Sequence, residues 1–217
     1  MRLSLVAALL LGTPVVLAAL PSSEVDFQYQ QPGNESCLGK AVAPAWDNEL
    51  RERLPEFTSL WRTAGPAMTQ AVIKITGRPF TPPSKVTLTL CEVPSNSFFG
   101  VTVNMRYALR SFTASPVPLR YKMDTVFHEM LHEFVGHNTP RASALLTAYS
   151  SESLCVRNHL HLLALQKAVL ISTGEIAELE QVIALDSLLP SGCYKRAWSI
   201  VNGTPSTYQT FLAEIAQ

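Results

Sequence analysis

Residues 127–132 read FHEMLH, a stretch in which two histidines stand four positions apart and a glutamate directly follows the first. In an α-helix, residues four apart lie about 40° from one another around the axis, so His128 and His132 are expected to project from one face. Glu129 falls at the flank of that face. All five histidines of the chain lie between positions 128 and 161. The stretch therefore predicts a helix that presents two imidazoles and a carboxylate together.

The residues around this motif predict that its helix is buried. Asp124 is the expected N-cap, and Gly136 is a stop signal. One narrow polar stripe on an otherwise apolar helix indicates a functional site. The alternative is a pair of packed core histidines without a metal, although core histidines usually occur one at a time. The apolar residues of the helix are Val126, Phe127, Met130, Leu131 and Phe134.

Two imidazoles and a carboxylate at this spacing are typical of a hydrolytic zinc site, which needs a third protein ligand. His137 follows closely, but on a continued helix it lies about 180° from His128. Glu152 lies on the helix expected after Pro140, and two helices joined by a short connection pack antiparallel. We therefore expect His128, His132 and Glu152 to bind one zinc ion, with His137 as the alternative third ligand.

The chain divides into three parts by composition. Residues 1–20 begin with Arg2 and continue as an apolar run that ends in small residues, which is typical of a secretory signal peptide. A membrane anchor is the alternative, because the run is nearly long enough to span a bilayer. Residues 21–44, rich in Pro, Gln, Ser and Gly, predict an extended arm, and residues 45–217 predict a single domain. After signal cleavage, no second apolar run of that length remains to span a membrane.

The domain is expected to have an α+β fold, because helical patterns stand on both sides of a short region with strand patterns. The sheet is expected to be small and antiparallel or mixed. Beyond about residue 124, the chain is expected to be helical almost to its end. The expected elements are helices over 45–62 and 63–75 with Pro55 as a break, strands over 85–91 and 98–107, and a helix over 140–172.

Charge and cysteine content limit the partners and the compartment. Seventeen basic residues balance seventeen acidic residues, and no basic stripe is visible, so neither nucleic acid nor an anionic membrane surface is an expected partner. Four cysteines in an exported chain predict two disulfides, for which three pairings are possible. We favour Cys37–Cys91 and Cys155–Cys193, because each pair would tie neighbouring parts of the chain together.

The motif at residues 128–132 looks like the signature of the zincin metallopeptidases, and a glutamate ligand on the following helix resembles the gluzincin branch. The resemblance covers the motif and about 60 residues around it. Residues 151–153 depart from the N-E-x-x-S-D run of thermolysin-like members. The metzincin branch is disfavoured, because Gly136 and His137 each miss its pattern by one residue and no methionine follows Met130.

The resemblance implies a zincin-like fold, with a small twisted sheet before the motif helix and a mostly helical C-terminal half. It implies zinc-dependent hydrolysis of peptide bonds by a secreted or periplasmic protein, with Glu129 as the general base. His159 and Tyr149, on the expected stripe of Glu152, are the candidate oxyanion donors. The edge strand at 98–106 is expected to bind the extended peptide or protein substrate. The alternative is a zincin-shaped zinc-binding module with a binding or regulatory role and little or no turnover.

Overall fold

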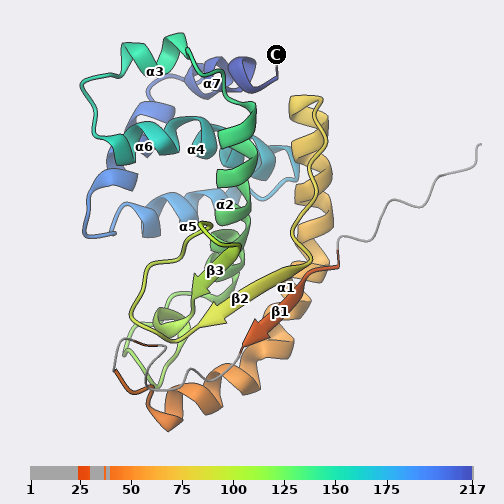
Figure 1. Cartoon of the computed structure of the whole chain (residues 1–217), viewed down its shortest axis with the longest axis vertical. Coiled ribbons are helices and arrows are strands. Elements are labelled where there is room, and N and C mark those ends of the chain that lie inside the picture. Colours follow the sequence, from red (N-terminus) through yellow and green to blue (C-terminus); the bar gives the residue numbers. More distant parts are fainter. Residues whose placement is uncertain (1–23, 30–36, 38–39, 217) are drawn as a thin grey trace, which may run out of the picture.

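The structure, a computed structural model, describes residues 24–29, 37 and 40–216. The predicted signal peptide at 1–20 and most of the predicted arm at 21–44 lie outside the described residues. The fold is α+β, as expected: a three-stranded sheet lies at one end of the molecule, and helices α3 to α7 gather at the other (Figure 1). None of the helices in the described part of the chain is long and apolar enough to cross a membrane.

The sheet has the order β1-β2-β3, and both strand pairs are parallel. Its strands are β1 (Asp26–Tyr29), β2 (Lys85–Thr89) and β3 (Val101–Asn104). The prediction of an antiparallel or mixed sheet is therefore wrong. Parallel strands need a long crossover, and α1 (Pro44–Thr76) supplies one between β1 and β2.

Strand β3 begins three residues later than predicted. Gly100 has a φ of 89°, which glycine adopts without strain, so the chain turns here before the strand begins. Behind the turn, Asn96 exchanges backbone hydrogen bonds with Thr102, at 2.9 and 2.8 Å. The residues at 98–100, expected to start the strand, therefore form the turn, and the segment before them lies along the outer edge of β3.

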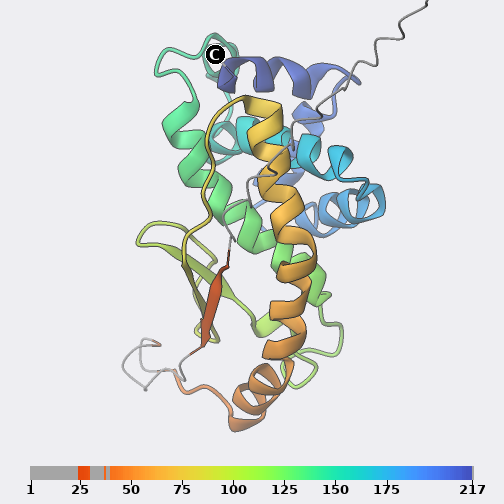
Figure 2. The ribbon, with the colours of Figure 1, turned by 90° about the vertical axis from the view of Figure 1, so that its right-hand side faces the viewer.

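Helix α1 is one continuous helix of 33 residues, although Pro55 and Pro66 lie inside it. A proline in a helix interior removes a backbone hydrogen bond and costs about 3 kcal/mol. The helix buries Phe57, Trp61 and Met68 along its length, and this packing offsets the cost. It runs beside the sheet and along α2 for much of the length of the molecule (Figure 2).

Helix α2 (Leu119–Asn138) carries the HExxH motif and lies between the sheet, α1 and α4. It begins five residues before the predicted cap, directly after Pro118. Asp124 is therefore an interior residue, and its carboxylate accepts a hydrogen bond from Arg120 Nε at 3.3 Å. Because α2 has neighbours on several sides, only a small part of the motif remains accessible.

The predicted helix over 140–172 is two helices in the structure. A turn at 149–152 separates α3 (Ala144–Ala148) from α4 (Leu154–Ser172), and Ser153 caps α4 by accepting a hydrogen bond from Val156 N at 3.2 Å. Helix α4 is apolar almost all round and forms the centre of the helical half. The remaining helices are the short 3-10 helix η1 (Arg106–Ala108), α5 (Ile176–Asp186), α6 (Cys193–Val201) and α7 (Thr207–Ile215).

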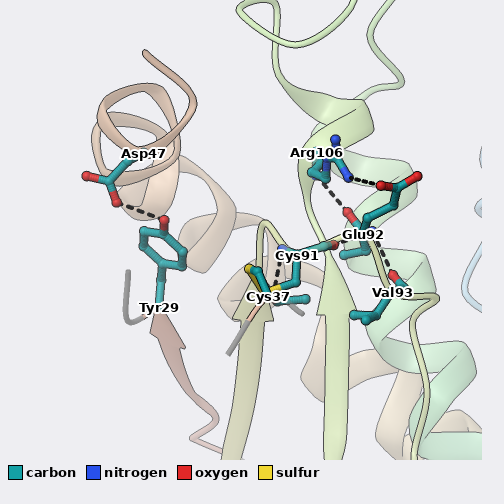
Figure 3. Close-up of a disulfide and its surroundings, with 9 residues drawn as sticks. Tyr29, Cys37, Asp47, Cys91, Glu92, Val93 and Arg106 are labelled. Carbon is teal, nitrogen blue, oxygen red and sulfur yellow. Dashed lines mark hydrogen bonds and ion pairs between the residues drawn. A yellow bond between two sulfur atoms is a disulfide. The ribbon is translucent and has the colours of Figure 1, made fainter. Parts of the chain in front are cut away.

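Both favoured disulfides are confirmed, with S–S distances of 2.01 Å for Cys37–Cys91 and 2.02 Å for Cys155–Cys193. Figure 3 shows the first disulfide near the end of β2, in the same region as Tyr29, whose hydroxyl donates to Asp47 Oδ1 at 2.8 Å. The second disulfide joins the first turns of α4 and α6. Disulfides of this kind are typical of proteins in oxidising compartments.

Candidate metal centre

Three histidines meet at the contact between α2 and α4. His128 and His132 come from successive turns of α2, and His159 comes from α4, which packs against it. Their candidate ligand nitrogens all lie within 4.8 Å of one another. The ring centroids are 4.9 Å apart for His128 and His132 and 5.4 Å apart for His128 and His159. The three rings therefore form a group that could hold one metal ion.

Hydrogen bonds on the far side of two rings fix which nitrogen faces the group. His159 Nδ1 lies 2.7 Å from the backbone oxygen of Cys155, which only accepts, so Nδ1 carries the proton and Nε2 has the lone pair. His128 Nδ1 lies 3.1 Å from Gln166 Oε1 and donates in the same way. Orientation of ligand histidines by such partners is a regular feature of metal sites.

Burial keeps the three imidazoles neutral. Desolvation lowers the pKa of His132 to about 4, with the charge of His159 as a smaller cause. The pKa of His128 also lies well below its usual value because of burial, and that of His159 is lowered for the same reason. Neutral imidazole is the form that ligates metals, so at neutral pH these rings need not lose a proton before binding.

Glu129 is buried beside this group, and it makes no hydrogen bond or ion pair with any residue in the described ranges. Burial raises the pKa of its carboxyl to about 7. Together with His128 it lines a cleft of about 930 Å³. A carboxylate with this affinity for protons, open to a cleft, suits a general base.

Tyr194 of α6 completes the group, and sequence reasoning missed it. Its hydroxyl lies 3.1 Å from His159 Nε2 and 3.4 Å from His128 Nε2. Burial raises the pKa of this hydroxyl, so it remains a hydrogen-bond donor at neutral pH. One signal was present: Tyr194 follows Cys193, whose expected partner Cys155 lies one turn before His159.

Glu152, the expected third ligand, is not in this group. It lies in the turn before α4, and its carboxylate accepts a hydrogen bond from Arg196 Nε at 3.0 Å. The neighbouring Arg196 lowers the pKa of Glu152. The expectation placed Glu152 and His159 on one helical stripe, but the chain leaves helical geometry ahead of Ser153, so only His159 is carried to α2.

The alternative ligand, His137, also lies apart from the three histidines. It is exposed near the end of α2 and lines a separate cavity of about 380 Å³, together with Glu133 and Phe80. Its position on the opposite side of α2 from His128 follows from the helical spacing that disfavoured it. His159 therefore replaces both earlier candidates as the third potential ligand.

Tyr149, a predicted oxyanion donor, and His161, for which no site role was expected, both lie away from the three histidines. The ring of Tyr149 packs on Phe211, with the centroids 6.0 Å apart, and contributes no donor to the group. His161 turns to the other side of α4, where its Nε2 lies 2.8 Å from Glu214 Oε2. Of the two predicted oxyanion donors, only His159 lies at the centre, and there its position fits a ligand.

The outer edge of β3, expected to bind a peptide, is already covered. Thr102 bonds to Asn96 in both directions, and the backbone N–H of Asn104 donates to Ser95 Oγ at 3.1 Å. A peptide could add to β3 only after this segment moved away. The cleft beside Glu129 is therefore the better-supported place for a substrate.

Comparison with known proteins adds no relative. No family model matches the chain, and neither a curated protein nor a solved structure matches it. The candidate centre therefore stands on its geometry. His159 also lies close to the sulfur atoms of Cys155 and Cys193, but their disulfide leaves no thiolate to bind a metal.

Proposed function

We propose that this protein is an exported zinc-dependent metallopeptidase. The observation that carries the proposal is the convergence of three neutral imidazoles beside the unpaired, buried carboxylate of Glu129, at the wall of a cleft. Three protein nitrogens leave one position of a tetrahedral ion open, which is the arrangement of catalytic zinc sites. His128, His132 and His159 would be the ligands.

The side chains have distinct roles in this proposal. A zinc ion held by the three histidines would polarise a substrate carbonyl and acidify a water molecule. Glu129 would accept a proton from the attacking water and pass it to the leaving amine. Tyr194, whose hydroxyl lies against two of the ligand rings, donates a hydrogen bond to the developing oxyanion.

The zincin resemblance agrees with part of this arrangement. Strands β2 and β3 precede the motif helix in the chain, and the following half is helical. The third ligand in our proposal is a histidine on α4, which departs from the glutamate of the gluzincin branch. The two disulfides support export to an oxidising compartment.

The direct test is metal analysis of the full chain, combined with cleavage of a mixed peptide library followed by mass spectrometry. We expect one zinc ion per chain, and we expect a chelator to remove both the metal and the cleavage. A protein that holds zinc but cleaves nothing would instead support the non-catalytic zinc-binding module. Folded protein without a transition metal would contradict both functions.

Replacing Tyr194 with phenylalanine tests the oxyanion donor. Loss of one such donor typically lowers kcat by roughly 10²- to 10³-fold, and we expect a reduction in this range with zinc content unchanged. The control is Tyr208→Phe on α7, whose ring lies beside Lys167 and away from the centre. An unchanged kcat in Tyr194→Phe would show that Tyr194 only packs against the ligands.

A further inference from the structure

The cleft beside Glu129 contains a second ionisable side chain that the proposed chemistry does not use. Lys122 lies on α2, seven residues before Glu129, and both line this cleft. The cleft is also lined by Tyr107, Leu188 and Leu189, which are exposed apolar side chains. A substrate in the cleft could therefore contact both apolar groups and Lys122.

Lys122 is buried without a counter-ion. It is only 7% exposed, and within the described part of the chain it makes no ion pair or side-chain hydrogen bond. Its nearest aromatic contact is the ring of Tyr121, at 5.9 Å from Nζ. Burial lowers the pKa of its ammonium group to about 8, so most of it stays charged at pH 7. Buried lysines are normally paired, because an unpaired buried charge is destabilising.

Three of the four acidic side chains that line the cleft already have hydrogen-bond or ion-pair partners. Asp124 accepts from Arg120, and Asp186 accepts from Tyr121 Oη at 2.7 Å and from Trp198. Glu92, which also lines the cleft, pairs with Lys40 and Arg106. Glu129 is the remaining acid, and it forms no ion pair with Lys122 among the described residues. Any partner for Lys122 must therefore come from outside the described chain.

Helix geometry sets the distance between the two groups. Seven residues correspond to nearly two full turns, so Lys122 and Glu129 lie on the same face, about 10.5 Å apart along the axis. An extended peptide covers about 3.3 Å per residue. A group bound at Lys122 would thus lie within about three residues of the peptide bond that faces Glu129.

We propose that Lys122 forms a subsite for a substrate carboxylate, so that the cleft selects peptides with a carboxylate within about three residues of the cleaved bond. A chain terminus and an Asp or Glu side chain offer the same chemistry. The selection of a substrate class rests on the proposed function, but the anion subsite itself does not depend on turnover.

The test measures peptide binding by calorimetry in the full chain loaded with zinc and carrying Glu129→Gln, which prevents turnover. Three probes are compared: acetyl-tetraalanine with a free C-terminus, its C-terminal amide, and an amide with aspartate at the third position. We expect at least one carboxylate probe to bind about 10-fold more tightly than the plain amide, the usual effect of a charge-assisted hydrogen bond. The terminal and aspartate probes show which source is preferred.

Adding Lys122→Met should bring the carboxylate probes to the affinity of the plain amide, whereas Lys74→Met, on the exposed side of α1, should leave the difference intact. Equal binding of all three probes, or a preference that survives Lys122→Met, overturns the subsite. The melting temperature of Lys122→Met shows that the variant is folded. If the preference depends on Lys122 but the parent chain cleaves no peptide, the peptidase proposal fails and the subsite stands.

Discussion

Glu129→Gln is expected to lower the rate of peptide hydrolysis by roughly 10²- to 10⁴-fold, the usual contribution of a general base, while the protein keeps its zinc. Glutamine has nearly the same shape as glutamate but cannot accept the proton of the attacking water. Glu129 lies next to the ligands and is not one of them, so metal binding should not depend on it. Hydrolysis rate and zinc content, measured on the same preparation, check both parts of the prediction.

Glu133→Gln is the matched control. Glu133 lies one turn further along α2 and is exposed, so the same substitution there changes the charge of the helix without touching the centre. We expect this variant to cleave like the parent. If Glu129→Gln also cleaves like the parent, another group takes the proton, and the role of Glu129 is wrong.

The part of the centre that was predictable from the sequence is the local part. His128, Glu129 and His132 lie on one helix, so their spacing alone places the two rings on one face and the carboxylate at its flank. The apolar residues around them likewise indicate burial. Helical geometry is the same in every protein, and such predictions need no knowledge of the tertiary structure.

The third histidine was not predictable in this way, because its position depends on where α4 begins. A helix continuing from Pro140 would present Glu152 and His159 on one stripe, and on that stripe the carboxylate is the expected ligand. Instead the hydroxyl of Ser153 caps a new helix by accepting a hydrogen bond from Val156 N. This single cap leaves Glu152 in the turn, where Arg196 binds it.

The sheet was also not predictable from local spacing, because it pairs segments that lie far apart in the chain. The segment of β1 has four residues, too few for a clear alternation, and it lies within the stretch expected to be an extended arm. Its pairing joins Phe27 with Val86, across the whole of α1. The number of cysteines predicted two disulfides, and the favoured pairing joins neighbouring parts of the chain, as the structure has it. The Cys155–Cys193 disulfide also brings Tyr194 to His159.

The sharpest test of the corrected ligand set is the comparison of His159→Ala with Glu152→Ala. Removing an outer partner of a metal ligand typically lowers metal affinity 10- to 100-fold, so we expect loss of a ligand itself to lower zinc affinity by more than about 100-fold. Glu152→Ala removes only an ion pair with Arg196 at the protein surface, and its zinc affinity should match the parent. Competition with a chromogenic chelator measures the zinc affinity of the parent and of both variants.

The metal-free forms provide the necessary control, because His159 also packs between α4 and α6. Without zinc, His159→Ala loses the hydrogen bonds of its ring to the Cys155 backbone and to Tyr194, but the Cys155–Cys193 disulfide still joins the two helices. A metal-free variant that melts cooperatively, yet gains little stability when zinc is added, has lost a ligand and kept its fold. If Glu152→Ala shows that behaviour and His159→Ala does not, the glutamate is the ligand after all, and the turn before α4 must rearrange when the metal binds.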